Sequence, residues 1–508
     1  MIPRADFGVQ GQEFTHQLFK DFPISNLEET SHVRVLLRKP DFQRETNHWS
    51  PEQIVTFVAS FLDNELIPAL ILWKSPLYIF VIDGGHRLSA LRAWMADDYG
   101  DGAISLKFYG GEISEAQKKV AQRTRSLIEN RIGRYTTLKS LIGSLTTSDN
   151  QTRRVGNLVT RTLDLQWVLG NAEVAETSFF KINSQGTPLD AVEAMLLTNR
   201  RKAIAIASRS ILRAGSGHKY WSKFSEDCQK QIETQAAEFH DLLFDPEADT
   251  PIKTLDLPLG GSVSPVEALA LLVDFLSISS SPQGSVRSIL LDPEDTDGTD
   301  TIRVLKLSKE ILTRFTGNNA ASLGLHPAVY FYNERGVHSR HLFLGTMKLL
   351  TEKVRNNDDA FFRKFTWVRA RIEQYLITNK PLITQMFTNV NRDARVLKVR
   401  DLLEFLIRNI DSGKEFTTEE LLASLGFAGR VLDIRSLVTK TKISEETKSA
   451  LFLRTSLAHA PKCPICSGLL YPKKSVSYDH KVRASAGGTG DIDNVQMVHP
   501  YCNSAIKN

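Results

Sequence analysis

The sequence reads Cys463-Pro-Ile-Cys466, then Tyr478-Asp479-His480, then Asn494-Val-Gln-Met-Val-His499-Pro-Tyr-Cys502-Asn503. It contains two pairs of metal-binding residue types, and two residues separate the members of each pair. This spacing lets a tight turn point both side chains of a pair at one tetrahedral zinc ion. The segment has too few large apolar residues to bury a core of its own, so a structural zinc would supply much of its folding free energy. We therefore predict a zinc site formed by Cys463, Cys466, His499 and Cys502.

The same segment holds residues that a purely structural zinc site does not require. They are an acid directly before a histidine, Asp479-His480, a turn at Gly487–Gly490, and the asparagines Asn494 and Asn503. A histidine with an unperturbed pKa near 6.5 can take a proton at neutral pH. A hard cation held by oxygen ligands neutralises charge that develops on a scissile phosphate. The pattern favours hydrolytic chemistry over the alternative, a zinc ribbon with an incidental Asp-His pair.

This segment, from about residue 460 to 508, resembles the HNH endonuclease family, whose ββα-metal fold holds one catalytic divalent ion between a β-hairpin and a helix. The resemblance implies that His480 is the general base, that Asp479 and Asn503 ligate a Mg²⁺ or Mn²⁺ ion, and that Asn494 ties the hairpin loop in place. The family often has Cys-x-x-Cys as its second zinc pair, whereas this chain has His499 first. Imidazole is an equally good zinc ligand, so we assign His499 to zinc, with a role at the catalytic ion as the alternative.

Basic residues lie around the expected active site: Lys473, Lys474, Lys481 and Arg483. We expect them to contact phosphates and to make DNA binding weaken with salt, and a solvated surface is the alternative. A second class of function is a regulator or assembly subunit whose zinc domain binds DNA without cutting it. The presence of Asp479, His480 and Asn503 argues against that class.

Composition places the chain among ordinary soluble globular proteins. Its 508 residues allow about three domains, and 42% are hydrophobic and 24% charged. The net charge of +5 and a pI near 8.8 permit contact with nucleic acid without demonstrating it. No apolar run approaches the roughly 18 residues of a membrane span, and the first residues do not form a signal peptide. With four cysteines, of which only Cys228 lies outside the zinc segment, we expect a cytoplasmic protein and a structural role for that thiol.

A helix followed by two strands is expected in the N-terminal part. Ser50 is a suitable N-cap and Pro51 suits the first helical position, and the apolar residues Ile54, Phe57, Val58 and Phe61 fall on one helical face. The runs 69–73 and 78–82 are rich in β-branched and aromatic residues, as strands are. The second run leads directly into Asp83-Gly84-Gly85-His86-Arg87, a glycine turn that opens a helix.

A strand, a glycine pair and a helix N-terminus together make a place where backbone N–H groups and the helix dipole face a phosphate. Arg87 could add a bidentate contact, and Asp83 could hold a metal or a ribose hydroxyl. Glycine pairs usually mark turns only, so this motif alone is weak evidence.

With Pro40-Asp-Phe-Gln43-Arg44 upstream and 180–189 downstream, the motif resembles the ParB/sulfiredoxin-related domain of the GmrSD modification-dependent restriction enzymes. The resemblance covers about residues 25 to 200. It implies a nucleotide-binding or nucleotide-hydrolysing site, or a pocket that reads phosphorothioate-linked or base-modified DNA. The residues that it implies for this site are Asp83, Gly84, Gly85, His86 and Arg87, with Gln43 and Arg44 beside them. Gly85 stands where the family usually has Gln. This difference argues against nucleotide hydrolysis more than against phosphate binding. Asn183 and Gly186 would form the far wall, or else a turn that caps a helix.

Helical periodicity dominates from about residue 200 to 455, with clear apolar spacing in 204–212, 266–276, 360–377 and 399–410. We expect exposed loops at 277–284 and at the acidic run 292–300. The stretch 361–371 interleaves aromatic and basic residues. We interpret it as an amphipathic helix with a solvated basic side, and a DNA-facing surface is the alternative.

Together these patterns predict an α+β protein with three domains. Residues 1–200 would form a ParB/sulfiredoxin-like α/β sensor domain, 201–455 a helical domain, and 456–508 a zinc-stabilised ββα-metal endonuclease. We expect a restriction-type anti-phage nuclease that acts on phage or modified DNA. The expected cofactors are structural Zn²⁺, catalytic Mg²⁺ or Mn²⁺, and a nucleoside triphosphate. An N-terminal domain that reads DNA without hydrolysing nucleotide is an alternative, and a homodimer is compatible with the sequence.

Overall fold

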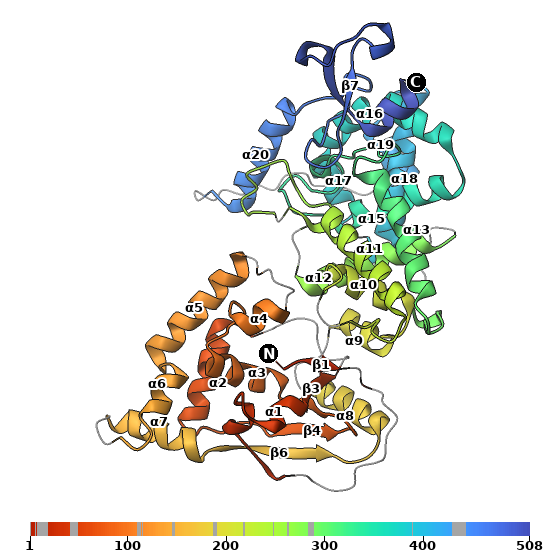
Figure 1. Ribbon diagram of the computed structural model, residues 1–508. Coiled ribbons are helices and arrows are strands. Elements are labelled where there is room, and N and C mark those ends of the chain that lie inside the picture. The colour runs from red at the N-terminus through yellow and green to blue at the C-terminus, as the bar shows by residue number, and fades with distance from the viewer. Residues whose placement is uncertain are drawn as a thin grey trace. The chain divides into compact units, whose positions relative to one another are not determined.

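The computed structural model folds into two compact units (Figure 1). One comprises Met1–Arg200 with Ser216–Tyr220, and the other Arg201–Gly215 with Trp221–Asn508. The described residues are 2–5, 7, 19–40, 49–108, 113, 115–144, 148–185, 190–216, 219–246, 248–261, 264–282, 289–388, 390–428 and 443–507. Gln43, Arg44 and Gly186 therefore lie outside the described residues. Among those described, no helix is long and apolar enough to cross a membrane.

The first unit is built on a mixed six-stranded sheet with the order β1-β3-β5-β4-β6-β2. Its strands are β1 (Arg4–Ala5), β2 (Asp21–Pro23), β3 (Leu37–Pro40), β4 (Leu70–Lys74), β5 (Ile79–Asp83) and β6 (Thr162–Val168). β1, β3 and β5 run parallel, whereas β4 is antiparallel to β5. The carboxyl ends of β1, β3 and β5 therefore share one edge of the sheet, and the Gly84-Gly85 turn follows β5 there.

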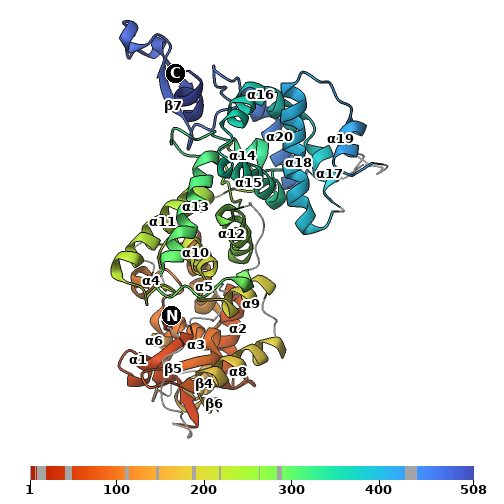
Figure 2. The same ribbon diagram turned by 90° about the vertical axis from the view of Figure 1, so that its right-hand side faces the viewer.

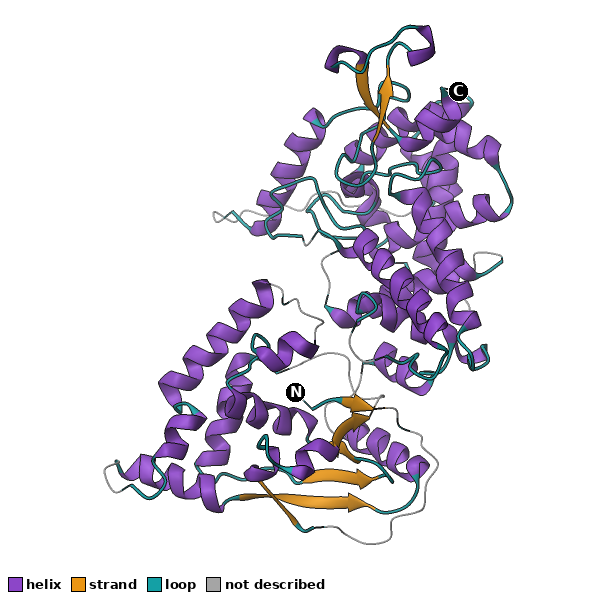
Figure 3. Cartoon of the chain, viewed as in Figure 1, coloured by secondary structure: helices purple, strands orange, loops and turns teal. Residues whose placement is uncertain are grey.

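Helices cover both faces of this sheet (Figure 3). They are α1 (His32–Leu36), α2 (Pro51–Leu62), α3 (Gly85–Ala96), α4 (Ala103–Phe108), α5 (Glu115–Arg131), α6 (Tyr135–Ser140), α7 (Asp149–Thr160), α8 (Ala172–Gln185) and α9 (Ala191–Thr198). α2, α3 and α5 to α7 share one apolar core with the sheet. On the other face, Trp73 and Phe80 of the sheet pack with Phe179 of α8.

The local expectations for α2 and α3 are confirmed. Ser50 and Gln53 form a capping box at the start of α2, which begins at Pro51. The buried face is shifted by one position from the predicted one, because Val55 and Leu62 are buried while Ile54 is half-exposed. α3 begins after Gly84, which has φ +93° and leaves so little room that a Cβ atom would lie 2.3 Å from Leu70. Only glycine fits this turn without strain.

The second unit is helical apart from a C-terminal hairpin (Figures 2 and 3). Its helices are α10 (Ala203–Leu212), α11 (Glu226–Phe244), α12 (Pro265–Ser280), α13 (Thr299–Phe315), α14 (Pro327–Tyr330), α15 (Arg340–Arg355), α16 (Asp359–Thr378), α17 (Lys380–Met386), α18 (Arg392–Asp411), α19 (Thr418–Ser424) and α20 (Glu445–His459). α10, α12, α16 and α18 confirm the predicted helical stretches. The prediction of a loop from residue 277 was wrong, because α12 continues to Ser280.

Buried hydrogen bonds explain why α12 continues through a serine-rich stretch. Ser279 is buried and donates to the Phe275 carbonyl oxygen, four residues earlier, at 2.7 Å. The same hydroxyl lies 2.7 Å from Ser308 of α13, so its hydrogen-bonding capacity is satisfied inside the core. A serine that bonds back to its own helix can replace the turn that composition suggests.

The C-terminal segment forms an antiparallel hairpin of β7 (Ser477–His480) and β8 (Val495–Val498), followed by a short π-helical segment, Cys502–Ile506. Contacts with the helices of the same unit hold it: Ser475 Oγ lies 3.0 Å from Thr316 Oγ1, and the Tyr471 hydroxyl donates to the Leu257 carbonyl at 2.9 Å. The segment from residue 463 onward, here called the C-terminal module, is therefore bonded into the second unit.

Candidate metal centre and active site

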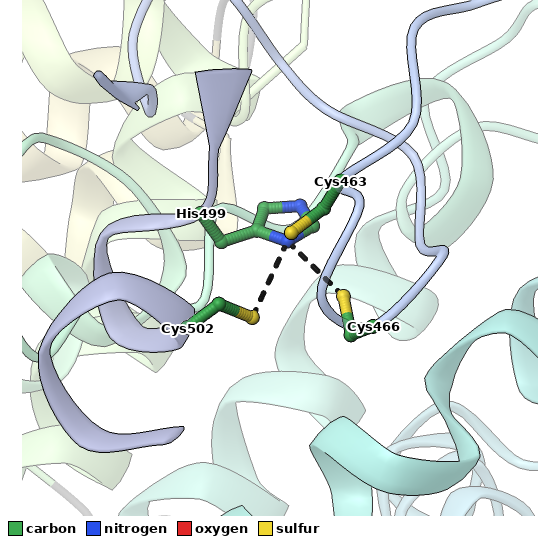
Figure 4. A group of neighbouring side chains, drawn as sticks. All are labelled: Cys463, Cys466, His499 and Cys502. Carbon is green, nitrogen blue, oxygen red and sulfur yellow. Dashed lines mark hydrogen bonds between the residues drawn. The ribbon is translucent and has the colours of Figure 1, made fainter. Parts of the chain in front are cut away.

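The four predicted zinc ligands meet at one point in the C-terminal module (Figure 4). Cys463 and Cys466 come from a tight turn, and His499 and Cys502 from the end of β8 and the start of the terminal segment. All four are buried, and their ligand atoms lie within 4.8 Å of one another. With Zn–S of about 2.3 Å and Zn–N of about 2.0 Å, tetrahedral ligands lie about 3.5 Å apart. The observed separations of His499 Nδ1 from Cys466 Sγ, 3.3 Å, and from Cys502 Sγ, 3.8 Å, fit that geometry.

His499 is oriented for this cluster by its second ring nitrogen. Its Nε2 lies 3.0 Å from the carbonyl oxygen of Leu469, so Nε2 donates and Nδ1 faces the sulfurs. Burial, and then the positive charge of Arg369, lower the pKa of His499, which favours the neutral imidazole that binds metal. The ring is fully buried, which favours zinc over the alternative role at a catalytic ion.

The three thiols also fit a divalent cation electrostatically. Hydrogen bonds from Cys466 and Cys502 lower the pKa of Cys463, whereas the contact with Cys463 raises the pKa of each of the other two thiols. Sulfurs this close cannot all ionise unless a positive charge lies between them. A zinc ion would supply that charge, and a Cys₃His set is one of the ligand sets of structural zinc sites.

A buried ion pair of α16 supports the zinc turn. Arg369 Nε lies 2.7 Å from Glu373 Oε1, and both side chains are almost fully buried. Glu373 Oε2 accepts a hydrogen bond from the backbone N–H of Leu469 at 2.6 Å. Because the Leu469 carbonyl in turn orients His499, α16 is linked through one residue to the metal centre.

Asp479 is held by two donors on the hairpin and the terminal segment. Its Oδ2 accepts from Gln496 Nε2 at 3.0 Å and from Lys507 Nζ at 2.5 Å. Burial raises the pKa of Asp479, but the hydrogen bonds from Lys507 and Gln496 outweigh burial and bring the pKa below its usual value. The carboxylate is therefore ionised at neutral pH, and it forms an ion pair with the Lys507 ammonium.

Asn503 faces the same side of β7 as Asp479. The Nδ2 atom of Asn503 donates to Ser477 Oγ at 2.8 Å. Lys507 lies four residues after Asn503, and it donates to Asp479, which lies two residues after Ser477. Alternate residues of a strand share a face, and residues four apart share a face in a helix. Asn503 and Asp479 thus lie on the same side of the hairpin, and amide and carboxylate oxygens are ligand types that suit a hard divalent ion.

His480 is the last residue of β7 and is half-exposed. In the described part of the chain no hydrogen bond engages its ring, whereas its carbonyl oxygen accepts from Lys507 Nζ. The imidazole is thus accessible to a water molecule at the end of the hairpin. A general base must also lie within hydrogen-bond reach of the water from which it takes the proton.

Asn494 closes the loop between the two strands. Its Oδ1 accepts from the Val482 N–H at 2.8 Å, and its Nδ2 donates to the carbonyls of Val482 at 3.2 Å and Thr489 at 2.6 Å. The backbone passes so close at Gly488 that a Cβ atom would lie 1.9 Å from the Val482 carbonyl oxygen. These contacts are those expected of a residue that ties the loop.

The four basic residues predicted to contact phosphate differ in their surroundings. Lys474 bonds to the Asp241 carbonyl oxygen and lies 3.5 Å from Asp245, so the structure gives it a partner within the unit. Lys481 donates to the Asp493 carbonyl at 2.7 Å, and Arg483 to the Lys507 carbonyl at 3.0 Å. Lys473 is exposed.

The glycine motif of the first unit forms a compact structural cluster. Arg87 is almost buried, lies 2.5 Å from Asp83, and also donates to the carbonyls of Pro68 and Ala69. The His86 ring stacks on Trp49 with centroids 5.9 Å apart. Asp83 remains partly exposed, with 42% of its side chain accessible. Asn183 lies in α8.

Two cations that the motif did not reveal lie at the same edge of the sheet. Arg4 of β1 and Lys39 of β3 are register partners on parallel strands. Burial, followed by the Arg4 charge, lowers the pKa of Lys39 to about 8. Ligands of such sheets bind beyond the carboxyl ends of the strands, where Asp83 and the glycine turn also lie. Only the pairing of β1 with β3 brings Arg4 to this edge.

Family models match two parts of the chain. The model for the N-terminal domain of GmrSD restriction endonuclease matches residues 24–200, and the model for HNH endonuclease matches residues 463–508. No curated protein and no solved structure matches the chain. The chain thus combines a GmrSD N-terminal domain with an HNH endonuclease domain, as the resemblances implied.

Proposed function

We propose that this protein is a metal-dependent restriction endonuclease in which the HNH module cuts DNA and the GmrSD domain senses nucleotide or modified DNA. The observation that carries the proposal is the arrangement on β7: an ionised Asp479 that already binds a cation, an accessible His480, and Asn503 on the same face as Asp479. These groups lie on a hairpin that a Cys₃His cluster and Asn494 hold in shape.

In this mechanism His480 takes the proton from a water molecule as that water attacks the phosphorus atom. Asp479 and Asn503 would hold the divalent ion, which supplies positive charge to the developing phosphorane and the leaving oxygen. Gln496 and Lys507 keep Asp479 ionised and oriented. Asn494 fixes the loop that follows β7 through its hydrogen bonds to Val482 and Thr489.

The catalytic proposal is tested with His480→Ala on plasmid DNA in Mg²⁺ or Mn²⁺. We expect cutting to fall by about 10²–10⁴-fold, the usual contribution of a general base. The matched control is His459→Ala, because His459 is exposed on α20 and, among the described residues, its ring forms a hydrogen bond only with the Thr455 carbonyl of its own helix. Undiminished cutting by His480→Ala would contradict the mechanism.

For the sensor we propose a phosphate site at the carboxyl ends of β1, β3 and β5. Arg4, Lys39 and the start of α3 supply positive charge there, and Asp83 supplies a carboxylate. Binding of each labelled nucleoside triphosphate is measured on the wild type and on Asp83→Asn and Lys39→Ala. If the wild type binds none of them, this part of the proposal fails.

A specific contact favours a second candidate for the same domain, a DNA-reading module that does not hydrolyse nucleotide. The Arg87 guanidinium already bonds to Pro68, Ala69 and Asp83, and Gly85 replaces the usual Gln of the family motif. Nucleotide release during cleavage of modified and unmodified phage DNA separates the two candidates. Cleavage that depends on DNA modification without release of inorganic phosphate favours the second.

A further inference from the structure

The buried side of α16 is fixed to the HNH module. Arg369 and Glu373 bond to Leu469 beside the zinc cluster, at 3.5 and 2.6 Å. The ring of Phe362 lies 6.3 Å from that of Tyr501 in the terminal segment. The opposite side of this helix is therefore held in a constant position relative to the hairpin that carries His480.

The exposed side of α16 presents a tryptophan between cations. Trp367 is 75% exposed, although an indole of this size is normally well buried. Arg363 and Arg371 are exposed and lie one helical turn on either side of it, and Lys364 is exposed beside Arg363. We call these four residues the α16 face; α16 is labelled in Figures 1 and 2.

Positive charge predominates around the α16 face. Within the described chain, Arg363 and Arg371 pair with no carboxylate, and Arg371 donates only to the Ile410 carbonyl at 3.3 Å. Lys364 lies 3.3 Å from Asp411 of α18, and Arg408 of the same helix is exposed. The exposed indole adds to these charges a flat apolar surface on which a nucleic-acid base can stack.

We propose that the α16 face binds a strand of the DNA substrate. The cations contact successive phosphates and the Trp367 indole stacks on a base, the combination that holds nucleic-acid strands in sequence-tolerant grooves. This inference rests on the proposed function and names a further surface of the same unit that contacts the substrate. Bidentate guanidinium contacts suit phosphates better than ammonium contacts, which agrees with two arginines flanking the indole.

The test measures binding of the full chain to fluorescein-labelled 30-nucleotide single-stranded and duplex DNA by anisotropy. All variants carry His480→Ala to prevent cutting, and no chelator is added, since chelation would remove zinc. We expect Trp367→Ala to weaken binding roughly tenfold and Trp367→Phe to retain most of the affinity. Arg363→Ala/Arg371→Ala should weaken binding and reduce the salt slope for duplex DNA by about two.

Two matched controls remove similar exposed groups elsewhere in the same unit. Leu451→Ala deletes a side chain that is 56% exposed on α20, and Arg454→Ala deletes an exposed cation of that helix. Both should bind DNA within twofold of the parent. Thermal unfolding shows whether each variant is folded.

If folded variants of the α16 face bind DNA with an affinity within twofold of that of the parent, the inference is overturned. It is also overturned if the parent binds neither single-stranded nor duplex DNA. A change of oligomeric state in Trp367→Ala with unchanged DNA affinity also overturns it and assigns the face to a second copy of the chain. Plasmid cutting by the wild type in Mg²⁺ decides the proposed function separately. If the protein binds DNA through the α16 face but does not cut it, this inference stands and the proposed nuclease function is contradicted.

Discussion

At the residue scale, the candidate active site depends on a carboxylate that already holds a cation. The Lys507 ammonium lies 2.5 Å from Asp479, and both side chains are mostly buried. A divalent ion that enters beside Asp479 must displace this ammonium or share the carboxylate with it. Lys507 therefore both keeps Asp479 ionised and competes with the metal for it.

Lys507→Met should strengthen Mn²⁺ binding roughly fivefold, because removal of a partly shielded ion pair of about 1 kcal/mol frees the carboxylate. Isothermal titration with Mn²⁺ in the His480→Ala background measures this without DNA. Lys473→Met, which removes an exposed lysine of the same module, is the control and should leave affinity unchanged. Weaker Mn²⁺ binding by Lys507→Met would contradict the competition.

The pKa of Lys39, about 8, predicts a pH dependence for the sensor. Lys39 is protonated below pH 8 and neutral above it, so nucleoside triphosphate affinity should fall by about three- to tenfold between pH 7 and 9. Arginine stays charged throughout, so Lys39→Arg should flatten the profile. Filter binding of the nucleoside triphosphate between pH 7 and 9 measures this dependence. If the affinity of the wild type does not change with pH, Lys39 does not contact the nucleotide.

At the element scale, α16 connects the helical part of the second unit to the zinc turn. Its ion pair is buried, with 1% of the Arg369 and 3% of the Glu373 side chain exposed. Breaking a buried pair leaves one charge without compensation, which is far more costly than losing an exposed pair. The same helix presents Trp367 on its outer side, so a single element both supports the metal centre and offers a surface for DNA.

Glu373→Gln should destabilise the second unit by about 3–5 kcal/mol and accelerate zinc loss. It leaves Arg369 unpaired and weakens the bond to Leu469 that supports His499. Denaturant unfolding and zinc release to a chromogenic chelator are the two measurements. Glu445→Gln, which breaks an exposed pair with Lys448, should change neither by much. Unaltered zinc release in Glu373→Gln would show that α16 does not support the centre.

At the scale of the whole molecule, the chain divides into two compact units, and the zinc cluster belongs to the second. The C-terminal module contacts helices of its own unit through Ser475, Tyr471 and Arg369. Those helices therefore support its fold, and we expect zinc in the Cys₃His cluster to stabilise it further.

Removal of zinc should lower the unfolding temperature of the second unit and leave that of the first unchanged. Metal that binds only the folded state stabilises it by mass action, and the Cys₃His cluster lies in the second unit alone. Calorimetry of the full chain before and after chelation, with zinc restored as a control, resolves the two transitions. An equal shift of both transitions would contradict the assignment.

The sequence by itself determined what depends on short spacings. The two-residue gaps of the zinc pairs, the Ser50 N-cap and the Gly84 turn are set by local geometry, and all three appear where the sequence predicted them. The resemblance alone supplied the roles of Asp479, His480, Asn494 and Asn503, which remain proposals.

Only the tertiary structure decided which distant residues complete each site. Lys507 reaches Asp479, Arg369 bonds beside His499, and Arg4 lies opposite Lys39. It also showed that Trp367 faces outward and that 277–280 are helical. The physical reason is that hydrogen bonds between distant segments, and burial itself, depend on how whole elements pack. The periodicity of a single helix or strand identifies an apolar face without showing which partner covers it.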